Sequence, residues 1–232
     1  IEPDSVDVCL VFHEAEKSTT ARWFELAERH RIPKGLRVAT GTNAYFAELN
    51  RQRPPRGATA CYSINPQVHT FDDLSLVETL EAQPVTVESA LQFCDRDLIV
   101  SPITLRPRFN PNATDPAEQR EDLSSAADPR QSTLFCAAWT VGSLARLLPL
   151  DRVRSLTFYE TSGPRGVMTS EPDSADPKAH GKLFPVYYVF EAIAGIRDLL
   201  PVSISDQTLV AAFALRNEQG QSIGLIANLT ND

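Results

Sequence analysis

A glutamate stands at the point where an apolar stretch of the chain ends. Residues 156–159 (LTFY) have the composition of a strand, and Glu160 follows them directly, before the turn sequence TSGP. A carboxylate is costly to desolvate there unless it meets a cation or a hydrogen-bond donor. At the carboxyl end of a parallel strand it would be held by the strand and open to a substrate, as a general acid, a general base or a nucleophile requires.

The sequence leaves the charge state of Glu160 open. The aromatic side chains of Phe158 and Tyr159 favour the neutral carboxyl group, whereas Arg106 or Arg108 would hold it ionised. Composition alone does not decide which effect is larger.

Polar side chains also follow three other predicted strands. They are Asn43, Tyr45 and Glu48 after residues 36–40, Asn65 and His69 after residues 60–64, and Arg106, Arg108 and Asn110 after residues 98–105. Because the carboxyl ends of parallel barrel strands build the active site, we predict that these side chains bind substrate, with His69 and Glu48 joining Glu160 in catalysis. The plainer alternatives are Asn-Pro turns, a structural histidine and a solvated glutamate.

Short apolar runs alternate with segments of helical periodicity along most of the chain. Strands are predicted at residues 6–12, 36–40, 60–64, 98–105 and 156–159, and helices at residues 19–30, 73–81, 87–94, 130–148 and 184–200. This alternation indicates parallel pairing, since each parallel neighbour needs a crossover connection, usually a helix. Neither a G-x-G-x-x-G nor a G-x-x-x-x-G-K-[ST] sequence occurs, which favours an α/β fold of the (β/α)8 TIM barrel type over a nucleotide-binding sheet.

The last segment of the chain changes character. Two apolar runs flank the polar turn NEQG at residues 217–220, which predicts a β-hairpin, and residues 169–180 are predicted to be a polar loop. We expect residues 1–200 to form the C-terminal portion, or second half, of the barrel, about strands 4–8, and residues 201–232 to begin a β-sandwich-like domain. A start at Ile1 and an end directly after an apolar run indicate a segment of a longer protein.

The composition limits the class of partner. The chain has 232 residues, 42% of them hydrophobic, and a net charge of −8, which disfavours binding to nucleic acid or to an anionic membrane. No apolar run is long enough to span a bilayer, and we expect a cytoplasmic protein that binds a small molecule. The four cysteines are interpreted as buried free thiols, and the four histidines lack ligand spacing, so neither a metal nor a cofactor is predicted. No oligomeric state is predicted.

Six strings in the chain are long enough to be specific. They are GTNAYFAELNRQRP (41–54), YSINPQVHTFDDLSLVETLEAQ (62–83), SPITLRPRFNPNAT (101–114), ADPRQSTLFCAAWTVGSL (127–144), FYETSGPRGVM (158–168) and FPVYYVFEAIAG (184–195). They resemble the D-apionate lactonase family, bacterial proteins built like glycoside hydrolases with a central (β/α)8 barrel and flanking β-rich domains. The resemblance implies opening of the D-apionolactone ring to D-apionate, in apiose catabolism, and a chain that lacks the family's early barrel strands.

The strand-end residues then suggest how such a lactonase would work. Water attacks the lactone carbonyl with Glu160 as general base, and His69 or the same carboxylate returns a proton to the leaving ring oxygen. Donors suited to the developing oxyanion are His69, Asn43, Asn65 and Arg106. No G-x-S-x-G sequence occurs, which argues against an acyl-serine route. The alternatives are a glycoside hydrolase, which needs a second carboxylate such as Glu48, and a non-catalytic carbohydrate-binding fragment.

Overall fold

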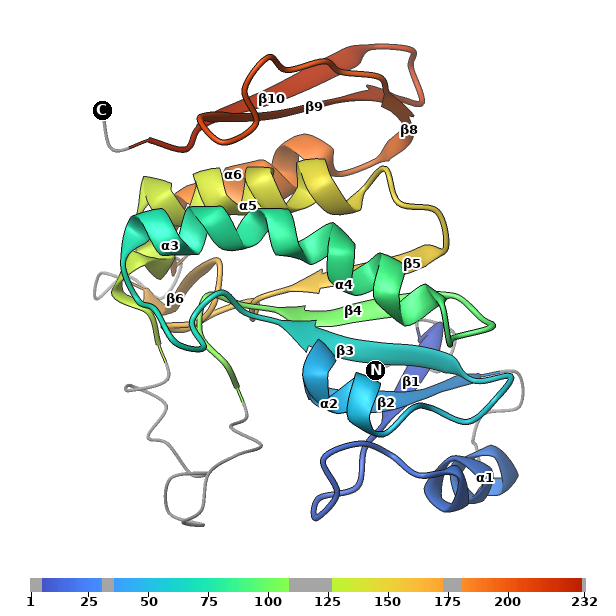
Figure 1. Cartoon of the computed structure of the whole chain (residues 1–232). Helices are drawn as coiled ribbons and strands as arrows, with labels where there is room; N and C mark the ends of the chain where they lie inside the picture. The colour runs from blue at the N-terminus through green and yellow to red at the C-terminus, as the bar shows by residue number, and fades with distance from the viewer. Residues whose placement is uncertain (1–5, 31–35, 109–126, 173–180, 231–232) are drawn as a thin grey trace. The chain divides into compact units, whose positions relative to one another are not determined.

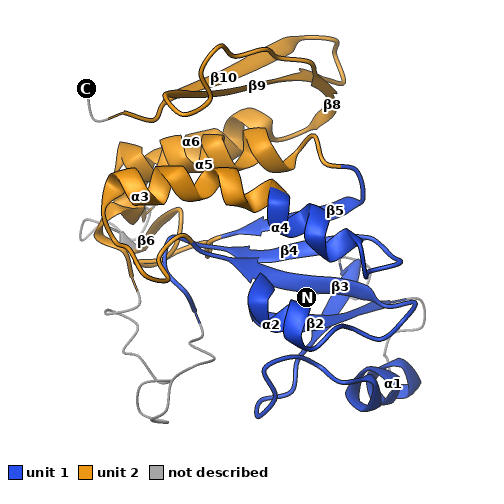
Figure 2. Cartoon of the chain, viewed as in Figure 1, with its two compact units in different colours: residues 1–65, 85–120, 151–158 blue, residues 66–84, 121–150, 159–232 orange. Residues whose placement is uncertain are grey.

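The chain divides into two compact units (Figure 2). The first comprises residues 1–65, 85–120 and 151–158, and the second comprises residues 66–84, 121–150 and 159–232. The computed structural model describes residues 6–30, 36–108, 127–172 and 181–230.

The first unit is built on a five-stranded parallel sheet with the order β1-β2-β3-β4-β5 (Figure 1). The strands are β1 (Val8–Val11), β2 (Arg37–Tyr45), β3 (Thr59–Ile64), β4 (Leu98–Ile103) and β5 (Val153–Phe158). Every neighbouring pair is parallel, so the predicted parallel strands in sequence order are confirmed. β2 continues to Tyr45 and β5 begins at Val153, both beyond the ranges that the apolar runs indicated.

Helices connect consecutive strands, as parallel pairing requires. The connections are α1 (Ala21–His30) after β1 and α2 (Phe46–Arg51) after β2, then α3 (Asp73–Glu78), η2 (Thr79–Glu81) and α4 (Ala82–Leu91) after β3, and η3 (Pro129–Ser132) and α5 (Leu134–Leu147) after β4. Periodicity missed the short helix α2 and placed the start of α4 too late. The remaining predicted helices between the strands are confirmed.

The five-stranded sheet is strongly curled. β1 and β5 are its two edges, and in a flat sheet four strand spacings would separate them by about 19 Å. Arg154 of β5 nevertheless forms an ion pair at 3.1 Å with Asp7, the residue that precedes β1. The buried cluster of this sheet comprises Ala39, Cys61 and Ile99, with Val8 and Leu10 packed against it. Curling of this kind is what the wall of a barrel requires.

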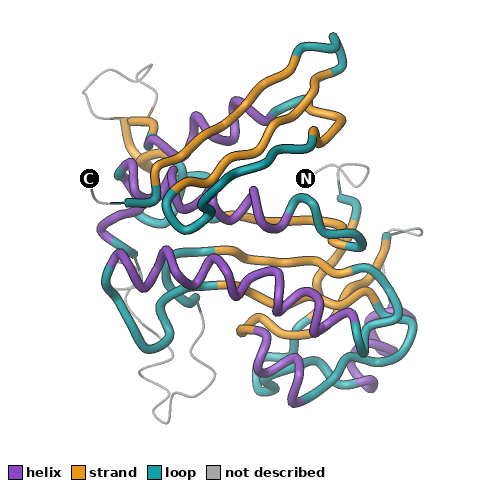
Figure 3. Tube along the Cα trace, turned by 45° about the horizontal axis from the view of Figure 1, so that its top comes forward, coloured by secondary structure: helices purple, strands orange, loops and turns teal. Residues whose placement is uncertain are grey.

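The second unit packs helices against a small antiparallel sheet (Figure 3). The sheet has the order β10-β9-β8, and its strands are β8 (Ile196–Leu200), β9 (Val210–Asn217) and β10 (Ser222–Asn228). α5 contacts α6 (Pro185–Ile193), β9 and β10. Trp139 of α5 is fully buried, and its indole N–H donates to the Leu76 carbonyl at 3.0 Å. A separate pair of strands is formed by β6 (Met168–Pro172) and β7 (Gly181–Leu183).

Two predictions for the second unit are corrected by the structure. The predicted helix at residues 184–200 ends at Ile193, because Gly195 adopts a φ of 72° and the following residues pair with β9 as strand β8. The predicted loop at residues 169–180 begins as strand β6, and residues 173–180 lie outside the described part. The predicted hairpin is confirmed, since β9 and β10 pair on either side of the NEQG turn.

Three of the four cysteines are buried free thiols, as predicted, and Cys9 is exposed. Cys9 points to the opposite face of edge strand β1 from the packed Val8 and Leu10. Burial raises the pKa of the Cys61 and Cys136 thiols to about 12, so both stay protonated. None of the helices in the described part of the chain combines the length and the hydropathy of a membrane-spanning segment.

Candidate functional site

The carboxyl ends of β2, β3 and β4 bring three of the predicted binding residues to one edge of the sheet. Tyr45 ends β2, Asn65 follows β3 directly, and Arg106 comes shortly after β4. β2 and β4 both pair with β3, and the Thr104 N–H donates to the Ile64 carbonyl at 3.0 Å, so the loops after β3 and β4 start side by side. In parallel barrels this edge carries the groups that meet the ligand.

The side chains at this edge differ in exposure. Asn43 is exposed and Tyr45 is half-buried. Burial raises the pKa of Tyr45, and the nearby Glu48 charge raises it further. The side-chain oxygen of Asn65 is buried and has no hydrogen-bond partner among the described residues. Since a buried polar atom normally has such a partner, this oxygen is suited to accept a hydrogen bond from a ligand or water.

A glycine shapes the end of β2. Gly41 has a φ of 141°, and a Cβ there would lie 2.1 Å from the Cys61 carbonyl oxygen. The Gly41 carbonyl accepts hydrogen bonds from the Thr19 N–H at 2.7 Å and from the Ser18 hydroxyl at 3.1 Å. The register between β2 and β3 shifts after Gly41. This irregularity sets the direction of the residues that follow, including Asn43.

Glu48 is buried on α2, so the alternative of a solvated helix residue is wrong. Its side chain is only 5% exposed, and it forms an ion pair with Arg51, one turn further along the helix. A buried carboxylate needs a cation of this kind. The ion pair gives Glu48 a structural partner, and its role as a second catalytic carboxylate stays a prediction.

The remaining predicted residues lie in loops. Arg106 is half-buried, whereas Arg108 and His69 are exposed. Asn110 lies outside the described residues. His69 and Glu160 belong to the second unit, and the other described candidates belong to the first.

Glu160 comes at the end of β5 and is paired with Arg165. The two side chains approach to 2.6 Å, with exposed fractions of 32% for Glu160 and 20% for Arg165. The Glu160 N–H also donates to the Arg165 carbonyl at 3.1 Å, so one residue holds both the backbone and the side chain of Glu160. Arg106 and Arg108 are the cations that the sequence suggests for Glu160, and Arg165 was not predicted. The sequence feature that could have indicated Arg165 is the turn TSGP, which reverses the chain after Glu160 and precedes this arginine.

The loop after Glu160 is closely braced. The Gly166 N–H donates to the Gly163 carbonyl at 2.9 Å, and the side-chain amide of Gln131 donates to the Gly166 carbonyl at 3.0 Å. A Cβ at Gly166 would lie 2.6 Å from the backbone of Ser162, so glycine is required by this close approach. The braced loop holds the Arg165 cation against the Glu160 carboxylate.

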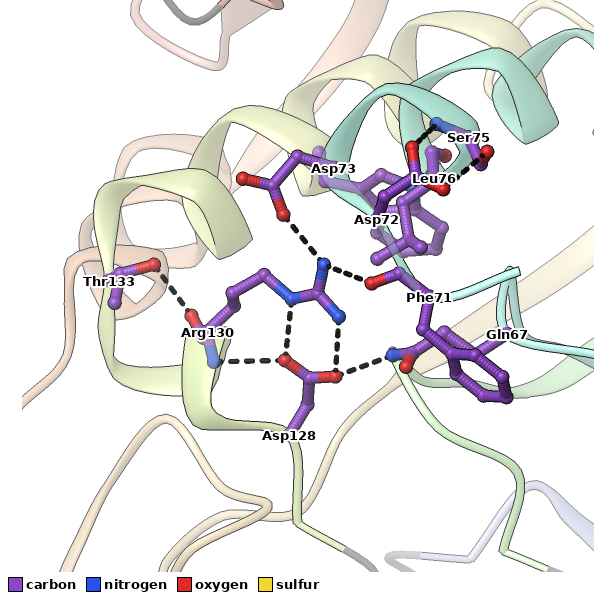
Figure 4. Close-up of polar contacts among 10 residues, drawn as sticks. Gln67, Phe71, Asp72, Asp73, Ser75, Leu76, Asp128, Arg130 and Thr133 are labelled. Atoms are coloured by element: carbon purple, nitrogen blue, oxygen red, sulfur yellow. Dashed lines mark hydrogen bonds and ion pairs between the residues drawn. The ribbon is translucent and has the colours of Figure 1, made fainter.

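A second group of polar side chains ties the loop after β3 to η3 (Figure 4). The Arg130 guanidinium donates two hydrogen bonds to Asp128, at 2.8 and 3.0 Å. It also donates to the Phe71 carbonyl at 3.0 Å and to Asp73 at 2.6 Å. The Gln67 amide donates at 2.5 Å to Oδ2 of Asp128, the oxygen that also accepts the 3.0 Å hydrogen bond from Arg130. The network therefore fixes the loop that carries His69.

The charge of Asp128 is stabilised within this network. Its side chain is 1% exposed, and burial by itself raises the pKa of the carboxyl group. The hydrogen bonds from Arg130 and Gln67 outweigh burial and lower the pKa of Asp128 to about 2. This network was not predicted from the sequence. Its local signal was the D-P-R sequence at residues 128–130, in which Asp128 caps η3 and proline stands at the first helical turn.

A pocket of about 850 Å³ lies beside these features in the second unit. Its lining includes Asp128, Gln131, Pro164, Thr169, Lys182 and Phe184. This mixture of polar and apolar groups, at this size, suits a small polar molecule. In the part of the chain that the structure describes, no three His, Cys, Asp or Glu side chains group in a way that would hold a metal ion.

Five parallel strands joined by helices, with polar side chains at their carboxyl ends, define a domain of the (β/α)-barrel class. The family described as D-apionate lactonase, TIM barrel domain, matches residues 16–198, and the chain belongs to this family. The resemblance carried by the six strings is thereby confirmed.

Two known proteins are similar to the chain over part of their length. A curated D-apionate lactonase from Brucella anthropi is 28% identical over 190 residues, which cover 78% of this chain and 30% of that protein. The crystal structure of a GH51 arabinofuranosidase from Xanthomonas axonopodis pv. citri superposes with a TM-score of 0.50 and 13% identity, over 79% of this chain and 40% of that one. At this identity the second likeness concerns the fold alone.

Proposed function

We propose that the chain is part of a hydrolase that opens a sugar-acid lactone, D-apionolactone, to D-apionate by carboxylate-assisted attack of water. The observation that carries the proposal is Glu160, a carboxylate at the end of the fifth parallel strand, within the family match and 2.6 Å from Arg165. The ion pair with Arg165 holds the Glu160 carboxylate in a defined position, and a positioned carboxylate is suited to act as a general base.

The proposed reaction proceeds in two proton transfers. Glu160 takes a proton from water as the water oxygen bonds to the lactone carbonyl carbon, which gives a tetrahedral oxyanion. The bond between that carbon and the ring oxygen then breaks, and the ring oxygen receives a proton from the Glu160 carboxyl group or from His69. The product is the open hydroxy acid. Oxyanion donors in this proposal are His69, Asn43, Asn65 and Arg106.

Recognition of the lactone hydroxyls is assigned in this proposal to the polar strand-end residues. They are Asn43, Tyr45, Asn65, Arg106, Arg108 and Asn110. The unsatisfied side-chain oxygen of Asn65 supports this assignment, because a substrate hydroxyl would supply the missing hydrogen bond. Glu48 is kept as the candidate second carboxylate.

The same proposal includes the place of the chain in the whole protein. Residues 1–200 would be about strands 4–8 of a (β/α)8 barrel, and residues 201–232 would begin a β-sandwich-like domain. The protein would act in the cytoplasm, in the catabolism of apiose, without a cofactor or a metal.

The test is lactone hydrolysis by the full-length natural protein, followed as acid release in a weakly buffered indicator, with D-apionolactone and aryl glycosides assayed side by side. Glu160→Gln should slow lactone opening by about 10²- to 10⁴-fold, the usual contribution of a general base. Glu191→Gln is the matched control, because it removes the same charge from an exposed position on α6.

Each outcome has a distinct meaning. Full lactone turnover in a folded Glu160→Gln protein would return Glu160 to a structural role. Turnover of aryl glycosides alone would move the assignment to a glycoside hydrolase. Activity on neither substrate would favour a carbohydrate-binding fragment.

A further inference from the structure

Tyr159, the residue directly before Glu160, has an unusual backbone conformation. Its φ is 50°, in the left-handed region that residues with a Cβ rarely adopt. Among the described non-glycine residues, only Arg152, with a φ of 67°, shares this property. Such a conformation persists only where the surrounding structure enforces it, and it is concentrated at functional sites.

The side chain of Tyr159 is held by a directional hydrogen bond. The residue is 4% exposed, and its hydroxyl oxygen lies 2.8 Å from the Thr140 hydroxyl oxygen. The Thr140 proton is donated to the Cys136 carbonyl at 2.7 Å, because a carbonyl can only accept. The Tyr159 hydroxyl is therefore the donor to Thr140. The ring also packs edge-on against Phe190, with 6.4 Å between the ring centroids.

The protonation state keeps this bond in place. Burial raises the pKa of Tyr159 well above its ordinary value of 10.0, with a further contribution from Cys136. The hydroxyl therefore stays a donor throughout the neutral range and cannot serve as a base there. We call the hydrogen bond from Tyr159 to Thr140 the anchor, because it fixes the side chain of Tyr159 to α5.

The conformation of Tyr159 sets the direction of the backbone at Glu160. Left-handed geometry at Tyr159 changes the direction of the chain after β5, and the Glu160 N–H then reaches the Arg165 carbonyl at 3.1 Å. The Glu160 carboxylate meets the guanidinium of the same residue at 2.6 Å. Loss of the anchor at Thr140 would let the backbone at Tyr159 relax toward ordinary strand geometry and would turn the carboxylate away from its present direction.

We propose that Tyr159, anchored on Thr140 of α5, is a positioning residue that sets the direction of the Glu160 carboxylate for the reaction. This inference rests on the proposed function, in which Glu160 is the general base. Reacting groups need close alignment, and a misplacement of about 1 Å can cost about 100-fold in rate. Tyr159 itself takes no part in proton transfer.

The test compares two buried tyrosine hydroxyls in the full-length protein, with D-apionolactone as substrate. Tyr159→Phe and Thr140→Val each remove one member of the anchoring bond. Tyr62→Phe is the matched control, because the Tyr62 hydroxyl is also buried, lies 2.8 Å from the Thr86 hydroxyl, and belongs to a residue with ordinary φ. Thr140→Ser, which keeps the acceptor, is the rescue variant.

Positioning predicts a specific kinetic pattern. Tyr159→Phe and Thr140→Val should each lower kcat by about 10- to 100-fold at unchanged KM. The double variant should lose no more than either single variant, because both break one bond. Thr140→Ser should retain most of kcat. Tyr62→Phe should lower the melting temperature to a similar extent without changing kcat.

Two results would overturn the inference, and they are distinguishable. An inactive Glu160→Gln protein beside fully active Tyr159→Phe and Thr140→Val proteins would leave the proposed function standing and reduce Tyr159 to a structural residue. Full activity of Glu160→Gln would remove the proposed function and the inference together. If Tyr159→Phe does not fold, Thr140→Val tests the same bond, since valine keeps the shape of threonine.

Discussion

Replacement of Arg130 with methionine should strongly destabilise the second unit. The guanidinium donates to both oxygens of Asp128, at 2.8 and 3.0 Å, and to the Phe71 carbonyl and Asp73. The Asp128 side chain is 1% exposed, so methionine would leave a buried carboxylate without its cation. Breaking a buried pair from one side costs about 3–5 kcal/mol. Because Arg130 is itself 17% exposed, we expect the lower end, a fall of about 3 kcal/mol in the free energy of unfolding at pH 7.

The pH dependence of this loss follows from Asp128. Its pKa of about 2, against an ordinary 3.8, corresponds to about 2.4 kcal/mol of stabilisation in the natural protein. Because the folded pKa lies below the unfolded value, this stabilisation is present above about pH 4 and is lost as the pH falls toward 2. In Arg130→Met the carboxyl group stays buried but loses its main donors. The difference in the free energy of unfolding between the natural protein and Arg130→Met should therefore shrink in acid, where protonation removes the buried charge of Asp128.

The assay is urea unfolding at pH 7 and in acid, followed by tryptophan fluorescence in a Trp23→Phe background, so that the signal comes from Trp139, which is buried in the same unit as Arg130. Arg29→Met is the control, because the Arg29–Glu25 pair is 3.8 Å apart and its side chains are 74% and 64% exposed. An exposed pair of this kind should change stability by less than about 1 kcal/mol. An Arg130→Met protein that loses no more stability than Arg29→Met would contradict this prediction.

Two further substitutions test the packing that carries the candidate site. In a thermal melt, Gly41→Ala should lower stability by more than about 1 kcal/mol, because the new Cβ would lie 2.1 Å from the Cys61 carbonyl oxygen. Gly224→Ala is the control and should be tolerated, because a Cβ there would meet open space. Trp139→Phe should cost about 1–3 kcal/mol in a denaturant titration, because it removes a fully buried indole and its hydrogen bond to the Leu76 carbonyl. The Leu76 carbonyl keeps the Thr79 hydroxyl as a donor, so an unchanged midpoint would show that the indole packing and its hydrogen bond contribute little.

The order of the elements followed from local patterns. Apolar runs separated by helical segments predicted five parallel strands, because a buried parallel strand is apolar on both faces and its crossover helix has a different period. The NEQG turn predicted the β9–β10 hairpin for an equally local reason. The same patterns failed at residues 196–200, where the apolar spacing is compatible with a helix and pairing with β9 made it strand β8.

The position of Glu160 at a strand end was likewise visible in the sequence, but its surroundings were not. Its ion pair with Arg165 depends on how the TSGP turn closes, and the anchor of Tyr159 depends on a threonine of α5. The bond between Gln67 and Asp128 joins residues 61 positions apart. Periodicity reports only whether a residue belongs to a helix or a strand and on which face, since it follows from local backbone geometry. Charge partners, burial and backbone strain arise when distant segments pack, so they emerged only with the folded chain.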